Sequence, residues 1–415
     1  MDLSRLAKAL DGAGEVREAT DADAVDGVPA SAVVRPASVE AVSAVLREAS
    51  TGGLVTVPRG GGTALDWGAP PERVDLLLDT TGLDAVVEHE SGDLVVVVEA
   101  GLPVSRLAET VREAGQELVA EVPRERVEAG STVGGALATA PSGPRRLQRG
   151  GLRDLVLGAT VVRADGVVAA SGGKVVKNVA GYDLAKLVTG AYGTLGVVVR
   201  AAFRLHPVPA ERGFVALTGG LRDVAAAARA VVASQLAPAA VEVDKPGGSD
   251  EATCVVLLEG VPSAVTARQA ETWTLLGDGA PSDEPAWWGR LPAADGDVLL
   301  KVTATLPGVA AVLEAARAAE QAHGVPVTVR GSAGGVLYAA VPASDAAAVA
   351  AVVGDLRAAS PSPGDGTVTV LRAPRAVREA VDAWGPVPGL ELMRRVKQQF
   401  DPGRLLSPGR FVGGI

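Results

Sequence analysis

The stretch Val57–Gly68, VPRGGGTALDWG, carries three consecutive glycines at the end of an apolar run. It follows residues 31–57, which predict a short strand, a helix begun by Ser38 and a second strand. Consecutive glycines let the backbone adopt positive φ and bring its N–H groups close to an anion, as phosphate-cradling loops do. A flexible turn between two strands would need glycine equally. The stretch matches neither the P-loop, which ends in Gly-Lys-Ser/Thr, nor the Rossmann spacing with its following helix.

A second glycine-rich stretch, AGSTVGGALATAPSGPRR, covers Ala129–Arg146. Ser131, Thr132 and the amides of Gly134 and Gly135 open what reads as a short helix, whose N-terminus would favour a pyrophosphate. Tight packing of that helix would explain its glycines equally well. Two such loops in the same half of the chain favour phosphate binding more than either loop does alone.

A third stretch, Lys177–Gly196, reads KNVAGYDLAKLVTGAYGTLG and combines a polar head with spaced glycines. The glycines are typical of close backbone packing at the entrance of a strand. The polar head is harder to explain by packing, because Lys174, Lys177 and Asn178 have no obvious reason to lie beside apolar strands.

Composition narrows the classes of function. A length of 415 residues predicts two or three domains, and a formal charge of -10 argues against non-specific nucleic-acid binding, which needs a basic face. The sequence shows no run of 18 uncharged apolar residues and no signal-peptide pattern, so we expect a cytoplasmic protein without a transmembrane segment. Cys254 is the single cysteine, which excludes an iron-sulfur cluster with all its ligands in this chain. Any such cluster would belong to a partner.

The chain divides into three predicted regions. Residues 1–210 hold the glycine-rich stretches, and a proline-rich linker, LHPVPAERG, ends them. Residues 211–384 alternate strands with Ala-rich helices, which predicts an α+β domain with a helical layer on an antiparallel sheet. Residues 385–415 predict a helix ended by Asp401-Pro402 and two turns.

The motifs PRGGGT, AGSTVGGALAT, RDLVLGATVVRADG and KNVAGYDLAKLVTGAYGTLG occur in this order. Their order resembles the FAD-binding domain of the vanillyl-alcohol oxidase / p-cresol methylhydroxylase (PCMH-type) superfamily. With RGGGTALDWG and the ending KQQFDPGRLLSPGR, the chain is similar over nearly its whole length to the FAD-binding E subunits of bacterial glycolate oxidases.

This resemblance implies an α+β protein: a PCMH-type two-subdomain FAD-binding domain over 1–210, an α+β cap domain over 211–384, and a C-terminal helix and tail over 385–415 that pack back on the FAD domain. Residues 58–63 and 130–135 would bind the FAD pyrophosphate, and Gly193 to Val197 would pack on the adenosine end. The loop Ser142 to Arg146 would lie near the flavin ring or the phosphates, and Phe400 to Arg410 would close on the first domain. The cofactor-binding residues implied are Pro58, Arg59, Gly60, Gly61, Gly62, Thr63, Gly130, Ser131, Thr132, Gly134, Gly135, Ser142, Arg145, Arg146, Gly193, Thr194, Gly196 and Val197.

Two departures from the superfamily affect the expected chemistry. Members with covalent FAD in this domain carry a His directly after the arginine-glycine run, where this chain has Thr63, so we expect non-covalent FAD. Related catalytic subunits hold a metal with a His-rich motif in the cap, and removal of the hydroxyl proton usually needs a His. This cap offers only His323. We therefore predict no metal site and no recognisable 2-hydroxy-acid site.

The catalytic residues are unknown from sequence. Arg145, Arg146, Lys177 and Tyr182 are the candidates. An α-hydroxy carboxylate needs an Arg or Lys side chain to hold it, which Lys174, Arg330 or Arg372 could also supply. Tyr182 and Asp183 would form a polar pair near the flavin or simply hold their loop.

Three functions remain open. The first is the FAD-binding subunit of a glycolate (2-hydroxy acid) oxidase or dehydrogenase complex, working beside a catalytic flavoprotein subunit and an iron-sulfur subunit, with membrane association only through those partners. The second is a stand-alone FAD-dependent oxidoreductase of another alcohol or hydroxy acid. The third is a non-catalytic assembly subunit.

Overall fold

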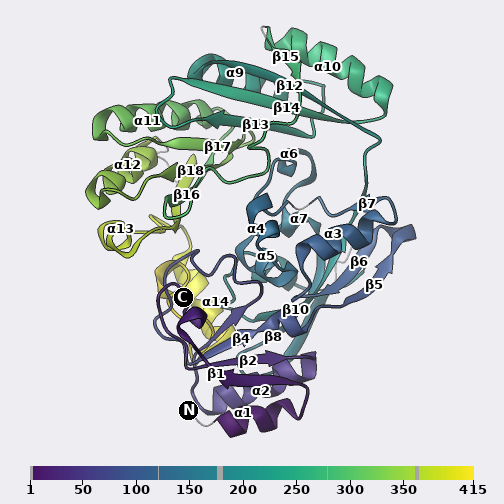
Figure 1. The fold of residues 1–415 in the computed structure, drawn as a ribbon, viewed down its shortest axis with the longest axis vertical. Helices are drawn as coiled ribbons and strands as arrows, with labels where there is room; N and C mark the ends of the chain where they lie inside the picture. Colours follow the sequence, from purple (N-terminus) through teal and green to yellow (C-terminus); the bar gives the residue numbers. More distant parts are fainter. Residues whose placement is uncertain (1–2, 120, 175–180, 278, 360–363) are drawn as a thin grey trace. The chain divides into compact units, whose positions relative to one another are not determined.

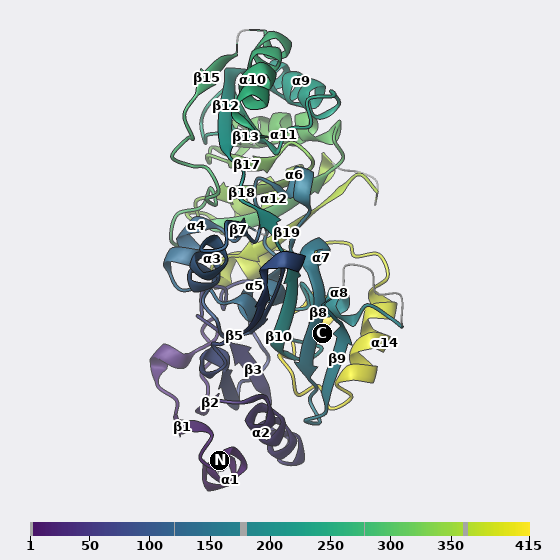
Figure 2. The ribbon, with the colours of Figure 1, turned by 90° about the vertical axis from the view of Figure 1, so that its right-hand side faces the viewer.

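The computed structural model describes residues 3–119, 121–174, 181–277, 279–359 and 364–415. The chain forms two compact units: unit 1 comprises residues 1–141, 151–208 and 389–415, and unit 2 comprises residues 142–150 and 209–388. Helices and strands are interspersed in both units (Figures 1 and 2), and the predicted α+β class is confirmed.

Unit 1 contains two main sheets. The helices and strands of unit 1 are α1 (Leu3–Leu10), β1 (Gly14–Glu18), β2 (Ala32–Pro36), α2 (Val39–Thr51), β3 (Thr56–Arg59), β4 (Leu76–Asp79), β5 (Val86–Glu90), β6 (Val95–Glu99), α3 (Val104–Arg112), β7 (Gln116–Glu117), α4 (Arg124–Glu128), α5 (Val133–Thr139), α7 (Leu152–Leu155), β8 (Val156–Val162), β9 (Val168–Gly172), α8 (Leu184–Val188), β10 (Val197–Arg204), β11 (His206–Pro207) and α14 (Leu390–Phe400).

The first sheet of unit 1 has the strand order β1-β2-β4-β3, in which β2 and β3 both run parallel to β4. Helix α2 begins where the Ser38 side chain accepts a hydrogen bond from the Ala41 amide at 3.1 Å, as the sequence predicts. Its apolar residues Val42, Val45 and Leu46 pack in a core with α1 and the sheet. This αβ unit fixes where β3 ends and the triple-glycine loop begins.

The second sheet of unit 1 is antiparallel, with the order β5-β6-β10-β8-β9. Strand β10 is buried along most of its length, with Arg200 and Arg204 as its exposed positions. Residues of α3, α5, α7 and α8 share a hydrophobic core with this sheet. The core holds α5, which carries the second glycine-rich stretch, against β6 and β10.

Unit 2 is built on one antiparallel sheet with the strand order β15-β12-β14-β13-β17-β18-β16-β19 among the described residues. The helices and strands of unit 2 are α6 (Arg146–Arg149), β12 (Glu211–Gly220), α9 (Leu221–Val232), β13 (Ala240–Lys245), β14 (Glu251–Gly260), α10 (Pro262–Leu276), β15 (Ala280–Ser282), β16 (Val298–Ala304), α11 (Gly308–His323), β17 (Thr328–Ser332), β18 (Val336–Val341), α12 (Ala346–Ala358), β19 (Gly366–Arg372) and α13 (Arg375–Ala380).

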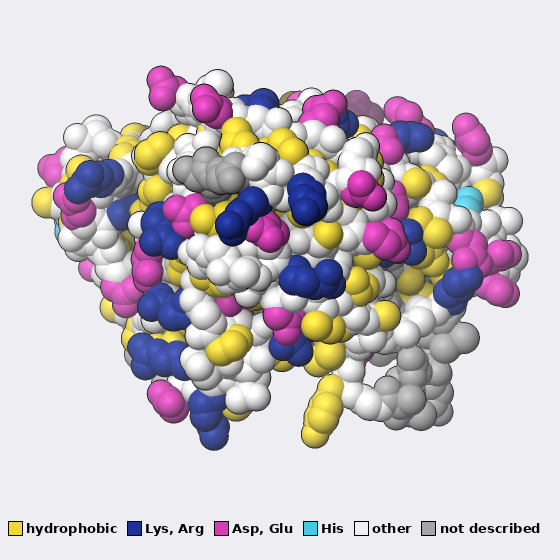
Figure 3. All heavy atoms as spheres, turned by 90° about the horizontal axis from the view of Figure 1, so that it is seen from below, with side chains coloured by type: hydrophobic (Ala, Val, Ile, Leu, Met, Phe, Trp, Pro, Cys, Tyr) yellow, Lys and Arg dark blue, Asp and Glu magenta, His cyan; other side chains and the backbone are white. Residues whose placement is uncertain are grey.

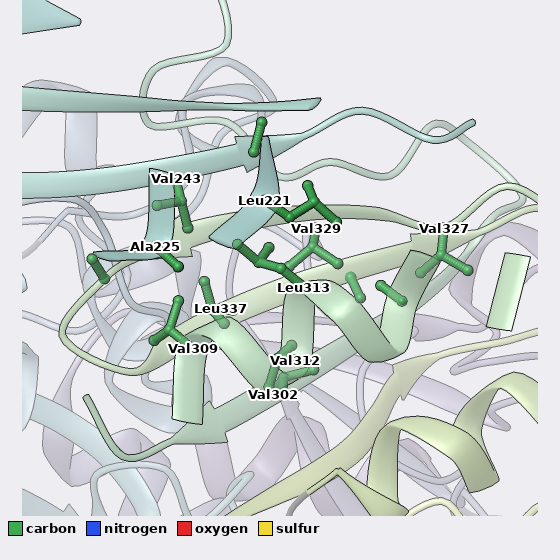
Figure 4. Packing of buried hydrophobic residues seen from close by; sticks show 14 of the residues in the cluster. Leu221, Ala225, Val243, Val302, Val309, Val312, Leu313, Val327, Val329 and Leu337 are labelled. Carbon is green, nitrogen blue, oxygen red and sulfur yellow. The ribbon is translucent and has the colours of Figure 1, made fainter. Parts of the chain in front are cut away.

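The core of unit 2 lies between this sheet and its helices. Figure 4 shows Leu313 of α11 among valines of the sheet, including Val302 and Val329. Because strand residues alternate between faces, the neighbours of these valines project from the opposite face of the sheet. On β13 and β14 that opposite face carries a second, smaller apolar cluster around Trp288.

Residues 142–150 leave unit 1 and join unit 2, although the sequence prediction places them in the first domain. The Ser142 amide donates to the Tyr338 hydroxyl at 2.8 Å, and Arg145 pairs with Glu259 at 3.3 Å. Leu147 packs against the core of unit 2. The end of the chain, from Gly389, packs instead within unit 1.

Candidate functional site

The triple-glycine loop leaves a row of backbone N–H groups without acceptors. Strand β3 ends at Arg59, and the loop turns away at once. Within the described part of the chain, the amides of Gly61, Gly62 and Thr63 donate no hydrogen bond. Gly62 has φ +74°, and a Cβ added there would meet only distant atoms. Successive amides of this kind form a concavity suited to an anion.

Two of the three glycines are required by packing. A Cβ at Gly60 would overlap the Thr132 hydroxyl, and one at Gly61 would overlap the Gly130 carbonyl. The first glycine-rich loop therefore lies directly on the second. Close packing therefore explains Gly60 and Gly61. It does not explain Gly62, and phosphate binding by this loop stays a prediction.

The amides at the start of α5 are already bonded. Gly134 donates to the Ala100 carbonyl at 2.7 Å, and Val133 donates to Leu102 at 3.0 Å. The Gly135 amide reaches the Thr132 hydroxyl at 3.4 Å, which caps the helix. The alternative explanation of the glycines in this stretch, tight packing of the helix, thus accounts for Gly134. Phosphate binding by 130–135 stays a prediction; of these residues, Thr132, Gly134 and Gly135 border the open spaces described next.

Two adjoining spaces of about 510 and 460 Å³ open over these loops. The first space extends over Gly61–Leu65 and the second over Gly193, Gly196 and Val197. The residues that border both spaces are Pro58, Arg59, Gly60, Gly135, Ala138 and Tyr192. The structure thus brings together residues from all three stretches that the sequence singles out. Glycine backbone, more than charged side chains, forms these walls.

The Arg59 side chain is committed to two carboxylates. Its guanidinium contacts Asp23 at 2.9 Å and Asp79 at 2.8 Å, and the side chain is mostly buried. Hydrogen bonds from Arg17 first, and also from Thr20 and Arg59, hold the pKa of Asp23 well below its usual range. Arg59 therefore fixes the end of β3 and leaves anion binding to the loop amides.

Two other arginines bond to the carbonyl groups of the loop. Arg126 donates to the Thr63 carbonyl, and its guanidinium lies 3.9 Å from the centre of the Trp67 ring. Arg410 donates to the carbonyls of Leu65 and Trp67 at 2.9 and 2.7 Å. These arginines bond the carbonyl groups of the loop and leave its amide groups without a bonding partner among the described residues. The role of Arg126 was not visible in the sequence, where it sits in a charged run outside the motifs.

The C-terminal segment joins the same unit. Thr56 of β3 donates to the Leu405 carbonyl at 2.7 Å and accepts from the Ser407 amide at 3.0 Å. The phenyl ring of Phe411 stacks on Tyr192, with centroids 5.5 Å apart. The tail thereby supports Tyr192, which borders both spaces, and the strand that leads into the triple-glycine loop.

Comparison with known proteins gives the cofactor. Residues 30–171 match the family described as FAD binding domain, and residues 377–411 match the family described as FAD linked oxidases, C-terminal domain. The matched residues 30–171, apart from 142–150, belong to unit 1, which has the PCMH-type FAD-binding fold. The predicted cofactor, FAD, and the predicted PCMH-type fold are confirmed.

Named relatives are similar over part of their length. Glycolate oxidase subunit GlcD of Bacillus subtilis is 32% identical over 52% of this chain and 46% of its own. D-lactate dehydrogenase of Archaeoglobus fulgidus is 33% identical over 51% and 46%, and glycolate oxidase subunit GlcE of Escherichia coli is 38% identical over 32% and 37%. The chain thus spans less than half the length of these curated relatives. A solved structure of alkyldihydroxyacetonephosphate synthase, 15% identical, shares the fold over 95% of this chain and 82% of its own, with a TM-score of 0.68.

The residues of the FAD-binding domain fit the cofactor on their own geometry. FAD carries a pyrophosphate, and the open amides of Gly61–Thr63 can donate to its oxygens. Positive φ at Gly193, +71°, lets the chain pass close to Pro58, where a Cβ would come within 2.7 Å of the ring. Thr194 is buried and donates to the Ala191 carbonyl, so it shapes this turn from within.

Several other predicted residues lie elsewhere. Ser142, Arg145 and Arg146 belong to unit 2, so their contact with FAD stays a prediction. Lys177 and Asn178 lie outside the described residues. The Tyr182 side chain is 92% exposed. Its neighbour Asp183 accepts from the Lys186 amide and caps α8, which is the structural role the sequence left open.

The two cap arginines proposed as clamps are bonded within unit 2. Arg330 contacts Asp244 at 2.7 Å, and Arg372 donates to the Ala294 carbonyl at 2.7 Å. His323 pairs with Asp355 at 2.8 Å. In the described part of the chain, no group of three or more His, Cys, Asp or Glu residues could hold a metal, and no helix is long and apolar enough to cross a membrane.

Proposed function

We propose that this chain is the FAD-binding subunit of a glycolate (2-hydroxy acid) oxidase or dehydrogenase complex, which passes electrons from its flavin to an iron-sulfur partner. The open amides of Gly61–Thr63, in a loop matched to an FAD-binding family, are the observation that supports it most. Relatives named for glycolate and D-lactate point to the acid class. Two of them are named as subunits of a glycolate oxidase.

The flavin would supply the oxidising chemistry, since it accepts a hydride from the carbon that bears the substrate hydroxyl. The chain's own residues bind and orient the cofactor. Gly61, Gly62 and Thr63 would donate to the pyrophosphate, while Arg126 and Arg410 keep the loop carbonyls turned away from it. With Thr63 in place of a histidine, nothing at this position would attach the cofactor covalently.

The proposed partner subunits follow from the small number of cysteine and histidine residues in the chain. Cys254, its single cysteine, is buried, and burial raises the pKa of its thiol to about 12. An iron-sulfur cluster must then be carried by another subunit. The scarcity of histidines favours a catalytic flavoprotein subunit that supplies the base for the hydroxyl proton.

Anaerobic titration tests the subunit role. The isolated chain, reconstituted with FAD, should keep an oxidised-flavin spectrum when glycolate or D-lactate is added, because it lacks the base that removes the hydroxyl proton. The complex purified from its native host should be bleached by glycolate and should contain non-haem iron. Bleaching of the isolated chain by either acid would instead favour a stand-alone oxidoreductase.

A further inference from the structure

Tyr192 borders both spaces of unit 1 and has a backbone conformation that few residues of its kind adopt. Its φ is +54°, in the left-handed region, where a Cβ atom crowds the following carbonyl group. The Tyr192 amide donates to the Ala138 carbonyl near the end of α5 at 2.9 Å. A residue keeps such a conformation only where its surroundings hold it there. The contacts that hold Tyr192 come from the loop after the triple glycine and from the C-terminal tail, residues 401–415.

Two consecutive residues of this tail hold the Tyr192 ring and the neighbouring loop. Phe411 stacks on the ring, with centroids 5.5 Å apart and 29° between the ring planes. Arg410 borders the first space and donates to two carbonyls of the loop. Gly68 allows both approaches, because a Cβ there would lie 3.2 Å from the Tyr192 ring and 2.7 Å from the Arg410 carbonyl. The tail thus supports the ring from the side of Phe411 and the loop from the side of Arg410.

The two spaces that Tyr192 borders differ in chemistry. The first includes the amides of Gly61–Thr63, which suit a pyrophosphate. The second is bordered by glycine backbone and by apolar side chains such as Val188 and Val198, and the Arg59 side chain beside it is bonded to two carboxylates. Such walls suit a flat, uncharged ring system. In FAD a ribose joins the pyrophosphate to adenine and a longer ribityl chain joins it to the flavin, so the ring system nearer the pyrophosphate is adenine.

We propose that the Tyr192 ring lies against the adenosine half of bound FAD, and that Phe411 is a positioning residue that acts through Tyr192. A base and an aromatic side chain attract each other by stacking, whatever the base. Because the tail holds the same ring that the cofactor contacts, binding of the cofactor and docking of the tail stabilise each other. The proposal rests on FAD as the cofactor and is independent of the subunit role.

ADP is the probe for this contact, because it carries the adenosine and the pyrophosphate of FAD without the flavin. Tyr192→Gly and Tyr192→Asn both remove the ring and both suit a left-handed backbone, so neither strains the turn. Calorimetry on the full chain freed of FAD should show each variant binding FAD and ADP about tenfold or more weakly than the wild type, the loss typical of a removed stack on a base. Trp273→Ala is the matched control, since Trp273 is a 48% exposed aromatic residue on α10 of unit 2.

The role of Phe411 is tested by a double-mutant cycle. Phe411→Ala should weaken ADP binding about threefold or more, and Phe411→Tyr should keep the wild-type affinity because it keeps the aromatic pair. In the Tyr192→Gly background, Phe411→Ala should have no further effect, since the residue through which it acts is gone. Hydrogen exchange of the amides in 405–415 should slow when ADP binds the wild type.

Circular dichroism and the melting temperature show whether each variant is folded. Equal ADP affinity in a folded Tyr192→Gly protein, or no ADP binding by the wild type, would overturn the proposal. Losses that add in the double variant, or tail exchange that ADP leaves unchanged, would overturn the positioning role of Phe411. Weaker binding of FAD without weaker binding of ADP would overturn the adenosine assignment. Failure of the subunit role is a separate result, because none of these measurements uses a hydroxy acid.

Discussion

Gly61 shows how one absent side chain allows a loop to become a binding site. A methyl group there would overlap the Gly130 carbonyl, so the two glycine-rich loops could not touch. The amides of Gly61–Thr63 would then move with the displaced loop. The sequence predicts this loop as a phosphate cradle from three adjacent glycines, but only the structure separates the packing glycines from the one that is left open.

We predict that Gly61→Ala weakens FAD binding about tenfold or more, since an added methyl in a packed site costs about 1–3 kcal/mol. Fluorescence titration of the apoprotein with FAD measures this. Gly92→Ala is the matched control, because a Cβ at Gly92 meets nothing within 4 Å. Equal FAD affinity in a folded Gly61→Ala protein would show that this loop does not hold the cofactor.

At the scale of elements, the C-terminal helix α14 is fastened by a buried ion pair. Lys397 donates to Asp401 at 2.7 Å and to the carbonyls of Thr194 and Leu406 at 2.8 Å each. Asp401 in turn accepts from the Leu406 amide. Burial lowers the pKa of Lys397, and Asp401 opposes that shift. The pair therefore ties the tail to the turn after Gly193, which borders the space over the glycine-rich loops.

We predict that Lys397→Met lowers the free energy of unfolding by about 3–5 kcal/mol, because Asp401 would be left as a buried, unpaired charge. Urea denaturation followed by circular dichroism measures the loss. Arg394→Met is the control, since Arg394 and Glu391 are 3.9 Å apart on the exposed side of the same helix and should contribute less than about 1 kcal/mol. Similar losses in both variants would contradict the assigned role of the buried pair.

Across the whole molecule, the features that the sequence predicts correctly are those that depend on residues close together in the chain. The loop at the glycine triplet and the start of α2 at Ser38 can both be predicted from the sequence, because turns and helix caps depend on neighbouring residues. Figure 3 shows a surface on which acidic and basic side chains are interspersed, as expected from composition. The packing of residues 142–150 in unit 2 could not be predicted from the sequence, because it depends on a hydrogen bond to Tyr338, which lies far along the chain.

The most direct test of the account is the absorbance spectrum of the purified chain after incubation with FAD and removal of unbound cofactor. We predict an oxidised-flavin spectrum with one FAD per chain, and acid precipitation should release the flavin into the supernatant because it is held without a covalent bond. A folded protein that stays colourless after FAD is supplied would contradict the central claim that the amides of Gly61–Thr63 bind this cofactor.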